Sequence, residues 1–199
     1  MLKIWLIRHG MTEGNRLKRY IGTTDEPLCQ EGEAFLKKLT YPKQEAVYVS
    51  PLLRCRQSAE ILFPGQRYHI LDELSECDFG EFENKNYQEL SGNANYQAWV
   101  DSNGTLPFPG GESREAFIRR SLRGFDLSVA GCLRQKAETA AVVAHGGTIM
   151  SVMEAYAQEG RSYYEWHVKN GGGYLVEIDP LRWKNGRRSF RILEAMMEG

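Results

Sequence analysis

Leu2–Asn15, with the sequence LKIWLIRHGMTEGN, is the stretch that decides the fold. Its apolar run Ile4–Ile7 is short and has no helical period, so it predicts a buried strand. The run ends at Arg8-His9-Gly10, and a cation and an imidazole are costly to place at the end of a buried strand unless they bind something. Ligands of open α/β sheets sit at that end of the strands, and Gly10 lets the chain turn sharply there. We therefore expect Arg8 and His9 to face a binding site.

The same layout recurs far along the chain. Ala140–Ala144 is a second apolar run, and His145-Gly146-Gly147 follows it. Either tripeptide alone is compatible with an ordinary strand exit whose side chains are solvated. Two buried strands that each end in His-Gly predict that His9 and His145 face one pocket, because ligands gather at the carboxyl ends of such strands.

The composition is that of a globular protein: 42% of the 199 residues are hydrophobic and 26% are charged. This length suits one domain over residues 1–199. A net charge of −1 argues against a general nucleic-acid binder. No apolar run approaches the roughly 20 residues that span a bilayer, and the N-terminus lacks a secretory pattern. We therefore expect a cytoplasmic protein with no membrane partner, and the oligomeric state is not readable from the sequence.

The next strand is predicted at Ala46–Val49, and Ser50-Pro51 after it has the residue types of a helix N-cap and first turn. This helix is expected to run to about Leu62. Arg54 then lies in its first turn, near the end of the preceding strand, where its guanidinium can reach the same rim as Arg8. The alternative is a solvated helix arginine.

A long helix is predicted after the capping residue Ser113. Its apolar residues step by three or four positions and form one stripe: Ile118, Leu122, Phe125, Val129 and Cys132. The arginines of this helix lie mostly off the stripe, so we expect them in solvent: Arg114, Arg119, Arg120 and Arg123.

The remaining pattern alternates strands and helices. Helices are expected at Glu33–Leu39 and Gly147–Tyr156, and strands at His69–Leu71, Thr139–Ala144, Gly173–Ile178 and Ser189–Leu193. The last two strands are joined by a hairpin-type turn at Lys184–Gly186. This order predicts a three-layer α/β/α fold with a mainly parallel central sheet.

An acidic and aromatic loop, Asp72–Glu83, follows the short edge strand. A solvated acidic face is one interpretation of it. In the other, one of its carboxylic acids serves as a proton donor. The residue pattern leaves the choice open among Glu73, Glu76, Asp78, Glu81 and Glu83.

The groups expected at one rim make an anion site, since guanidiniums match phosphate geometry and a helix N-terminus adds N–H donors. They are Arg8, His9, Asn15, Arg54, His145 and the Gly146 backbone, with one acid from the loop. A neutral imidazole can attack phosphorus, and a nearby carboxylic acid must then protonate the poor alkoxide leaving group. Without a Walker-type Gly-rich loop, nucleotide hydrolysis of that kind is disfavoured.

The order of the motifs resembles the histidine phosphatase superfamily, also called the phosphoglycerate mutase-like family, over nearly the whole chain. The motifs are LIRHGMTEGN at 6–15, Gly22-x-x-Asp25-x-Pro27-Leu28 with Gly32, SPLLRCRQSAE at 50–60, LSECDFGEFE at 74–83 and VVAHGGTI at 142–149. This resemblance implies a phosphoglycerate mutase-like fold, a phosphohistidine at His9 and Glu76 as the proton donor. It also implies that the phosphoryl oxygens are bound by Arg8, Asn15, Arg54, His145 and the Gly146 amide.

Within the superfamily, the chain looks most similar to the α-ribazole phosphatase branch, through its short length and the stretches Phe79–Glu83 and Pro109–Ser113. Those enzymes remove the 5′-phosphate during assembly of the lower ligand of cobalamin. The chain departs from the family pattern near the expected substrate mouth. Cys29 stands where a small hydroxyl residue is common, Phe82 where Trp is frequent, and Asn84–Asn86 in place of the usual Gly-Lys.

Several alternatives remain at this point. A phosphoglycerate mutase uses the same pocket but needs covering segments that keep water out, and the chain looks short for them. A broad phosphatase of sugar phosphates or nucleotides also fits the motifs. A non-catalytic module that binds a phosphorylated ligand has little need of the proton donor Glu76. In each case the expected partner is a small phosphomonoester.

We expect neither a metal nor another cofactor, because two arginines in the pocket repel a divalent cation. The remaining histidines, His69 and His167, are expected to pack or to face solvent. The four cysteines include no Cys-x-x-Cys pair. If Cys55 or Cys77 lines the pocket, a thiol oxidant should inhibit the enzyme.

Overall fold

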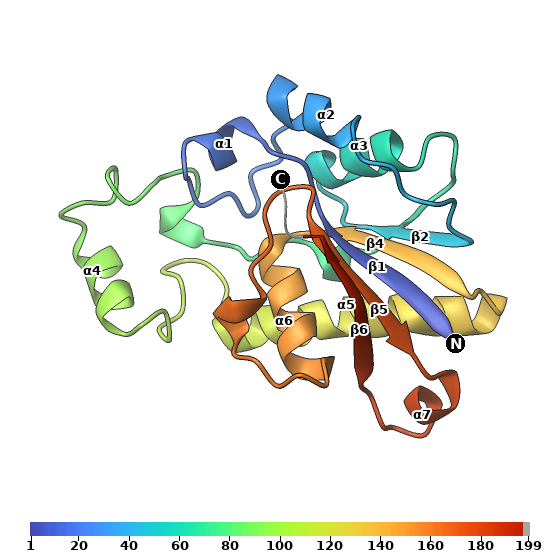
Figure 1. The fold of residues 1–199 in the computed structure, drawn as a ribbon. Helices are drawn as coiled ribbons and strands as arrows, with labels where there is room; N and C mark the ends of the chain where they lie inside the picture. Colours follow the sequence, from blue (N-terminus) through green and yellow to red (C-terminus); the bar gives the residue numbers. More distant parts are fainter. Residues whose placement is uncertain (197–199) are drawn as a thin grey trace.

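The computed structural model describes residues 1–196, so the last three residues of the predicted domain 1–199 lie outside the described part. At the centre is a six-stranded sheet in the order β3-β2-β4-β1-β5-β6 (Figure 1). Its strands are β1 (Leu2–Arg8), β2 (Ala46–Val49), β3 (His69–Ile70), β4 (Thr139–Ala144), β5 (Gly173–Ile178) and β6 (Phe190–Met196). β5 pairs antiparallel with β1 and β6, and the other neighbours pair in parallel. The predicted mainly parallel sheet is confirmed.

Helices cover both faces of this sheet (Figure 1). α2 (Gln30–Leu36) and α3 (Leu53–Leu62) pack on one face, and α5 (Arg114–Gln135) and α6 (Gly146–Tyr156) on the other. Short helices lie in the connections: α1 (Glu13–Arg16), α4 (Ala94–Asp101), α7 (Pro180–Lys184), η1 (Asp72–Leu74), η2 (Gly80–Phe82) and η3 (Tyr163–Trp166). Between residues 1 and 196, no helix is long and apolar enough to cross a membrane. The predicted three layers are confirmed.

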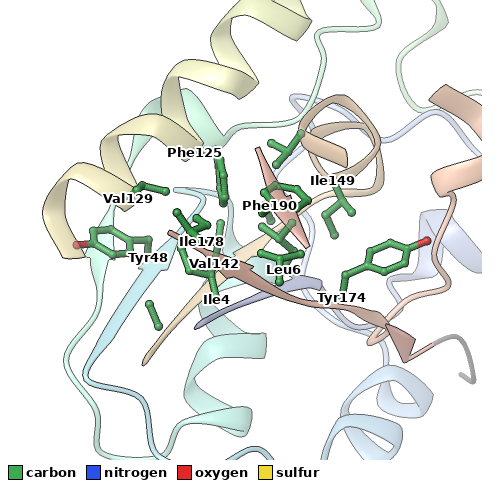
Figure 2. Packing of buried hydrophobic residues seen from close by; sticks show 14 of the residues in the cluster. Ile4, Leu6, Tyr48, Phe125, Val129, Val142, Ile149, Tyr174, Ile178 and Phe190 are labelled. Atoms are coloured by element: carbon green, nitrogen blue, oxygen red, sulfur yellow. The ribbon is translucent and has the colours of Figure 1, made fainter. Parts of the chain in front are cut away.

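The central strand β1 buries apolar side chains on both faces. Ile4 and Leu6 join the cluster beneath α5 and α6, which Figure 2 shows, whereas Trp5 and Ile7 join the cluster beneath α2 and α3. Alternation with a period of two is the geometry of a strand. Burial on both faces explains why the sequence reads as a continuous apolar run.

The register of β1 and β4 brings the ends of the two strands level. Arg8 lies opposite Ala144, and the backbone N–H of His9 donates to the carbonyl of Ala144 at 3.0 Å. His9 and His145 therefore leave neighbouring parallel strands at the same edge of the sheet. Their ring centroids are 5.1 Å apart.

Ser50 does not cap the helix after β2, and that prediction is wrong. α3 begins at Leu53 with Leu52 at its N-cap, and the Ser50 hydroxyl lies 2.7 Å from His145 Nε2. The N–H of Ser50 donates to the carbonyl of Val143 at 3.0 Å, which continues the pairing of β2 with β4. This pairing keeps Ser50 beside the sheet, where its hydroxyl contacts His145 and accepts the N–H of Leu52, at 3.4 Å, ahead of the first helical residue.

Other boundaries also differ from the predictions. α2 begins at Gln30 rather than Glu33, because the Cys29 thiol accepts the N–H of Gly32 at 3.4 Å and caps the helix there. β5 and β6 do pair antiparallel, but α7 occupies their connection. The segment 184–186 is therefore the end of a short helix rather than a hairpin turn.

Candidate active site

His9 is buried just beyond the end of β1. Its Nδ1 lies 2.6 Å from the carbonyl oxygen of Gly10, which can only accept, so Nδ1 carries the proton. Nε2 then keeps its lone pair. Burial lowers the pKa of His9 well below its usual value, and the nearby guanidiniums of Arg54 and Arg8 lower it further. The imidazole is therefore neutral at pH 7, with Nε2 available as a nucleophile.

Arg54 is fully buried in the first turns of α3, which excludes the solvated-arginine interpretation. Its Nη1 donates to the carbonyl of Thr24 at 2.8 Å, and its Nη2 donates to the carbonyls of Gly22 at 2.9 Å and Ile21 at 3.3 Å. The loop therefore holds the guanidinium through backbone oxygens. Nε of Arg54 is buried and has no acceptor among the described residues.

Arg8 is the second guanidinium of the site. Its Nη1 donates to the carbonyl of Val168 at 2.7 Å and lies 3.5 Å from Nε2 of His167. Like Arg54, it has a buried Nε without an acceptor in the described part of the chain. Buried donors without partners are costly, and a bound anion would satisfy both.

His145 occupies the N-cap position of α6, directly after β4. Its Nε2 contacts the Ser50 hydroxyl at 2.7 Å and the Cys55 thiol at 3.5 Å. Burial lowers the pKa of His145 well below its usual value, and Arg54 and His9 contribute in the same direction. Gly146 is the first residue of α6, where backbone N–H groups have no partner within the helix.

Glu76 is the carboxyl group that the fold places among these cations. Its Oε1 accepts the N–H of Cys77 at 2.9 Å, and a Cβ built at Gly147 would lie 2.8 Å from the same oxygen. Burial raises the pKa of Glu76 above its usual value, against the opposing effect of Arg54 and Arg8. Burial therefore favours the protonated acid.

The other four candidate carboxyl groups bind elsewhere. Glu73 pairs with Arg123 at 3.4 Å, and Asp78 accepts the N–H of Gly80 at 2.9 Å. Glu81 accepts a side-chain N–H of Asn95 at 3.0 Å, and Glu83 accepts the N–H groups of Gly22 and Thr24, both at 2.8 Å. Of the five candidates, Glu76 is the one that lines the same cavity as Arg8 and Gly146.

Asn15 lies in α1 with its amide oxygen already occupied. That oxygen accepts the N–H of Thr12 at 3.3 Å and Nδ2 of Asn170 at 3.0 Å. The amide nitrogen of Asn15 is left as a donor. Asn170 also donates to the carbonyl of His9 at 3.2 Å, so it links α1 to the end of β1.

The family of the chain follows from a comparison with known proteins. Residues 4–189 match the model of the histidine phosphatase superfamily, branch 1. The chain belongs to this superfamily. The match includes every predicted site residue, and it makes the chain a phosphatase of the histidine type.

Similar proteins agree with this family. The histidine phosphatase is 29% identical to the adenosylcobalamin/alpha-ribazole phosphatase of Salmonella typhimurium, over 89% of this chain and 90% of the relative. It is 32% identical to a 2,3-bisphosphoglycerate-dependent phosphoglycerate mutase of Rhizobium etli, over 77% of this chain and 79% of the relative. The crystal structure of the alpha-ribazole phosphatase from Shigella flexneri matches with a TM-score of 0.81 at 24% identity, over 99% of this chain and 96% of that chain. The predicted phosphoglycerate mutase-like fold is confirmed.

A cavity of about 280 Å³ extends from Arg8, Glu76 and Gly146 of the histidine phosphatase. Most of its other lining is aromatic and comes from separate segments: Tyr20, Phe79, Trp99, Phe108, Phe117, Tyr163 and Tyr164. Two ring pairs pack edge to face, with centroid distances of 5.4 Å for Tyr20–Phe79 and 5.0 Å for Phe79–Phe108. Arg114, which was expected in solvent, also lines the cavity, with its guanidinium 4.9 Å from the centre of the Tyr163 ring. The cavity thus joins a cationic end to a largely aromatic wall.

Three residues that organise the site are not recognisable from the sequence. Their sequence pattern predicts a helix cap for Ser50, solvent exposure for Arg120 and no role for Asn170. Arg120 is instead half-buried and binds the carbonyl of Glu76 at 3.1 Å. Asn170 precedes three consecutive glycines, a pattern that indicates close backbone approach but does not identify the partner.

Cys77 lines the cavity, and Cys55 is buried against His145. Burial raises the pKa of Cys55 to about 12 and also raises that of Cys77, so both thiols are protonated at pH 7. His167 lines the cavity beside Arg8, and His69 stacks on Tyr48. Within residues 1–196, no group of three or more His, Cys, Asp or Glu side chains could hold a metal ion.

Proposed function

We propose that this histidine phosphatase hydrolyses a phosphomonoester through a phosphohistidine at His9, and that its substrate is α-ribazole 5′-phosphate. One observation carries the mechanism. Arg54 and Arg8 carry unpaired buried donors, and both act electrostatically on the neutral imidazole of His9 and on the carboxyl group of Glu76, whose pKa is raised. This common neighbourhood supports a site that combines a nucleophile, an anion site and a proton donor, as phosphoryl transfer requires.

In the first step, Nε2 of His9 attacks phosphorus and the P–O bond to the leaving group breaks. The protonated carboxyl group of Glu76 gives its proton to the departing oxygen, because an alkoxide is a poor leaving group. Phosphorylation makes the imidazole more acidic at Nδ1, and the Gly10 carbonyl at 2.6 Å stabilises the positive charge that develops there.

In the second step, water attacks the phosphohistidine. The carboxylate of Glu76 accepts a proton from the water, the P–N bond breaks, and inorganic phosphate leaves. His9 returns to its neutral form and Glu76 to its acid form, so the cycle closes without a further reactant.

The donors around His9 hold the phosphoryl group. Arg8 and Arg54 offer buried N–H groups without acceptors, and the amide nitrogen of Asn15 has no other role among the contacts described. His145 and the Gly146 N–H complete the set at the N-terminus of α6, where an anion is stabilised. These fixed donors stabilise the negative charge that spreads over the transferring group. We propose that no metal takes part, because two guanidiniums already supply the positive charge.

Two observations support α-ribazole 5′-phosphate. Its leaving group carries an aromatic bicyclic base, and the cavity wall next to the anion site is built from aromatic rings. In addition, relatives named as alpha-ribazole phosphatases match nearly the whole chain.

The test is an assay of the purified protein in excess EDTA. The substrates are α-ribazole 5′-phosphate, a panel of sugar and nucleoside phosphates, and 3-phosphoglycerate with and without 2,3-bisphosphoglycerate. We expect a strong preference for α-ribazole 5′-phosphate and loss of activity in His9→Ala. Similar low rates on every monoester would overturn the substrate, and isomerisation of phosphoglycerate would indicate a mutase. Turnover that survives His9→Ala would refute the phosphohistidine.

A further inference from the structure

Arg120 of α5 binds the segment that carries Glu76, although the sequence places it in solvent. Its Nη1 donates to the carbonyls of Ser75 at 2.8 Å and Glu73 at 3.3 Å, and its Nη2 donates to the carbonyl of Glu76 at 3.1 Å. Nε and Nη2 also form a two-pronged ion pair with the carboxylate of Glu112, at 3.1 and 2.7 Å. Every nitrogen of this guanidinium therefore has an acceptor.

We propose that Arg120, held in place by Glu112, is a positioning residue for the general acid Glu76. This inference rests on the role proposed for Glu76 above. Arg120 contacts the backbone of the acid and does not line the cavity, so its hydrogen bonds reach the reaction through the segment that carries Glu76. Its charge also helps to lower the pKa of His145, an effect that Arg120→Lys retains.

The segment needs such a support because it has little regular structure. It consists of the single turn η1 (Asp72–Leu74) followed by an irregular stretch up to η2. Leu74 is fully buried and anchors the start of the segment in the core. Three carbonyl groups of this segment, at residues 73, 75 and 76, converge on one planar guanidinium. The guanidinium gives them a fixed partner and so fixes their relative orientation.

Glu112 secures the far side of the same segment. Its carboxylate holds Arg120, while its backbone N–H donates to the carbonyl of Asp78 at 2.9 Å. The acid at position 76 thus lies between two attachments, one at residues 73–76 and one at residue 78. A charged pair that also binds backbone carbonyls is stronger than neutral hydrogen bonds of the same geometry.

The chain supplies a matched control on the same helix. Arg123 lies one turn further along α5 and pairs with the Glu73 side chain at 3.4 Å, but its own side chain is 73% exposed. An exposed ion pair of this kind contributes little. Arg123→Ala removes a guanidinium from the same helix without touching a carbonyl of the acid segment.

The experiment compares two leaving groups. An alkyl phosphate such as α-ribazole 5′-phosphate needs the proton of Glu76, whereas p-nitrophenyl phosphate releases a stabilised phenolate that needs none. We expect Arg120→Ala to lower kcat/KM for the alkyl phosphate roughly tenfold to hundredfold, part of the full contribution of a general acid. For p-nitrophenyl phosphate, kcat/KM should change less than about threefold, and Arg123→Ala should change neither value.

The second step gives an independent readout. Hydrolysis of the phosphohistidine needs the same carboxylate as a base, so kcat for p-nitrophenyl phosphate should fall in Arg120→Ala although kcat/KM does not. A burst of nitrophenolate should then precede the steady state. Arg120→Lys keeps the charge but not the planar fork, and it should fall between the wild type and Arg120→Ala.

Equal loss of kcat/KM on both substrates would overturn the proposal, because that pattern indicates damage to the phosphate pocket or the fold. Unchanged kcat/KM on both would overturn it as well. The value for p-nitrophenyl phosphate also reports whether each variant has folded its pocket. Failure of the proposed function has a different signature: turnover would persist in the His9→Ala variant, whether or not Arg120 is changed.

Discussion

Gly147→Ala should displace Glu76, the proposed proton donor, without disturbing the fold. A Cβ at this position would lie 2.8 Å from Oε1 of Glu76, whereas ordinary contact begins at 3.4 Å, so the carboxyl oxygen must retreat by about 0.6 Å. The same Cβ would lie 2.9 Å from two ring atoms of Phe117. A misplacement of about 1 Å can cost roughly a hundredfold in rate, so we expect kcat/KM to fall roughly tenfold to hundredfold.

Stability should change much less than activity. Gly147 lies inside α6 with ordinary helical geometry, where alanine is the better helix former by up to about 1 kcal/mol. That gain offsets part of the overlap with Phe117. In a chain of this size, each kcal/mol of change in the free energy of unfolding shifts Tm by about 2–4 °C. We therefore expect the Tm of the variant to stay within a few degrees of the wild-type value.

The assay pairs kcat/KM for an alkyl phosphate with the inhibition constant of inorganic phosphate. Phosphate should bind Gly147→Ala as it binds the wild type, because the three atoms nearest to the added methyl group belong to Glu76 and Phe117 rather than to Arg8 or Arg54. A fully active variant would refute the reasoning that Gly147 makes room for the acid. A loss of phosphate affinity as large as the loss of kcat/KM would also refute this reasoning, because the substitution would then have damaged the anion site.

Three further predictions concern pH and single side chains. The pKa of His9 is lowered and that of Glu76 is raised. For an alkyl phosphate, kcat/KM should therefore persist below pH 6.5 and fall as pH rises through the pKa of Glu76. An equal fall with p-nitrophenyl phosphate at high pH would contradict this assignment. Ser50→Ala leaves Nε2 of His145 without its hydroxyl partner and should lower the free energy of unfolding by about 1–3 kcal/mol, measured by urea titration. Unchanged stability would show that the 2.7 Å contact contributes nothing. Cys77 lines the cavity as a protonated thiol, so oxidants should inhibit slowly at pH 7 and faster at higher pH, and full activity after complete thiol blocking would exclude the effect.

The layered fold was predictable because its signals are local. The apolar runs of β1 and β4 each end in His-Gly, and the side chains of β1 alternate between the two cores as a strand requires. The length of each run and its polar end identify the strands and the edge of the sheet where they meet. Helix boundaries were less accurate in two places. At Cys29 a thiol supplies a cap that the sequence does not indicate, and at Ser50 continued strand pairing prevents the expected cap.

The supports of the site were not predictable, because they join residues far apart in sequence. Arg120 lies 44 positions from Glu76, and Ser50 lies 95 positions from His145. No periodicity links such pairs, and an arginine off an apolar stripe has the same pattern whether it meets water or a backbone carbonyl. The choice of Glu76 among five acids came from the family resemblance, and the residue types alone left it open.

The way in which Arg54 is held has a consequence for how this enzyme can change over generations. Its guanidinium binds the carbonyls of Ile21, Gly22 and Thr24, and every amino acid supplies the same carbonyl. Substitutions at the partly exposed position 24 can therefore reshape the loop surface without removing an acceptor from the arginine. The other two positions are constrained, because Ile21 is buried and a Cβ at Gly22 would lie 1.9 Å from the carbonyl oxygen of Cys77. An architecture of this kind lets the loop surface drift while the guanidinium of Arg54, which we propose binds the phosphoryl group, stays fixed.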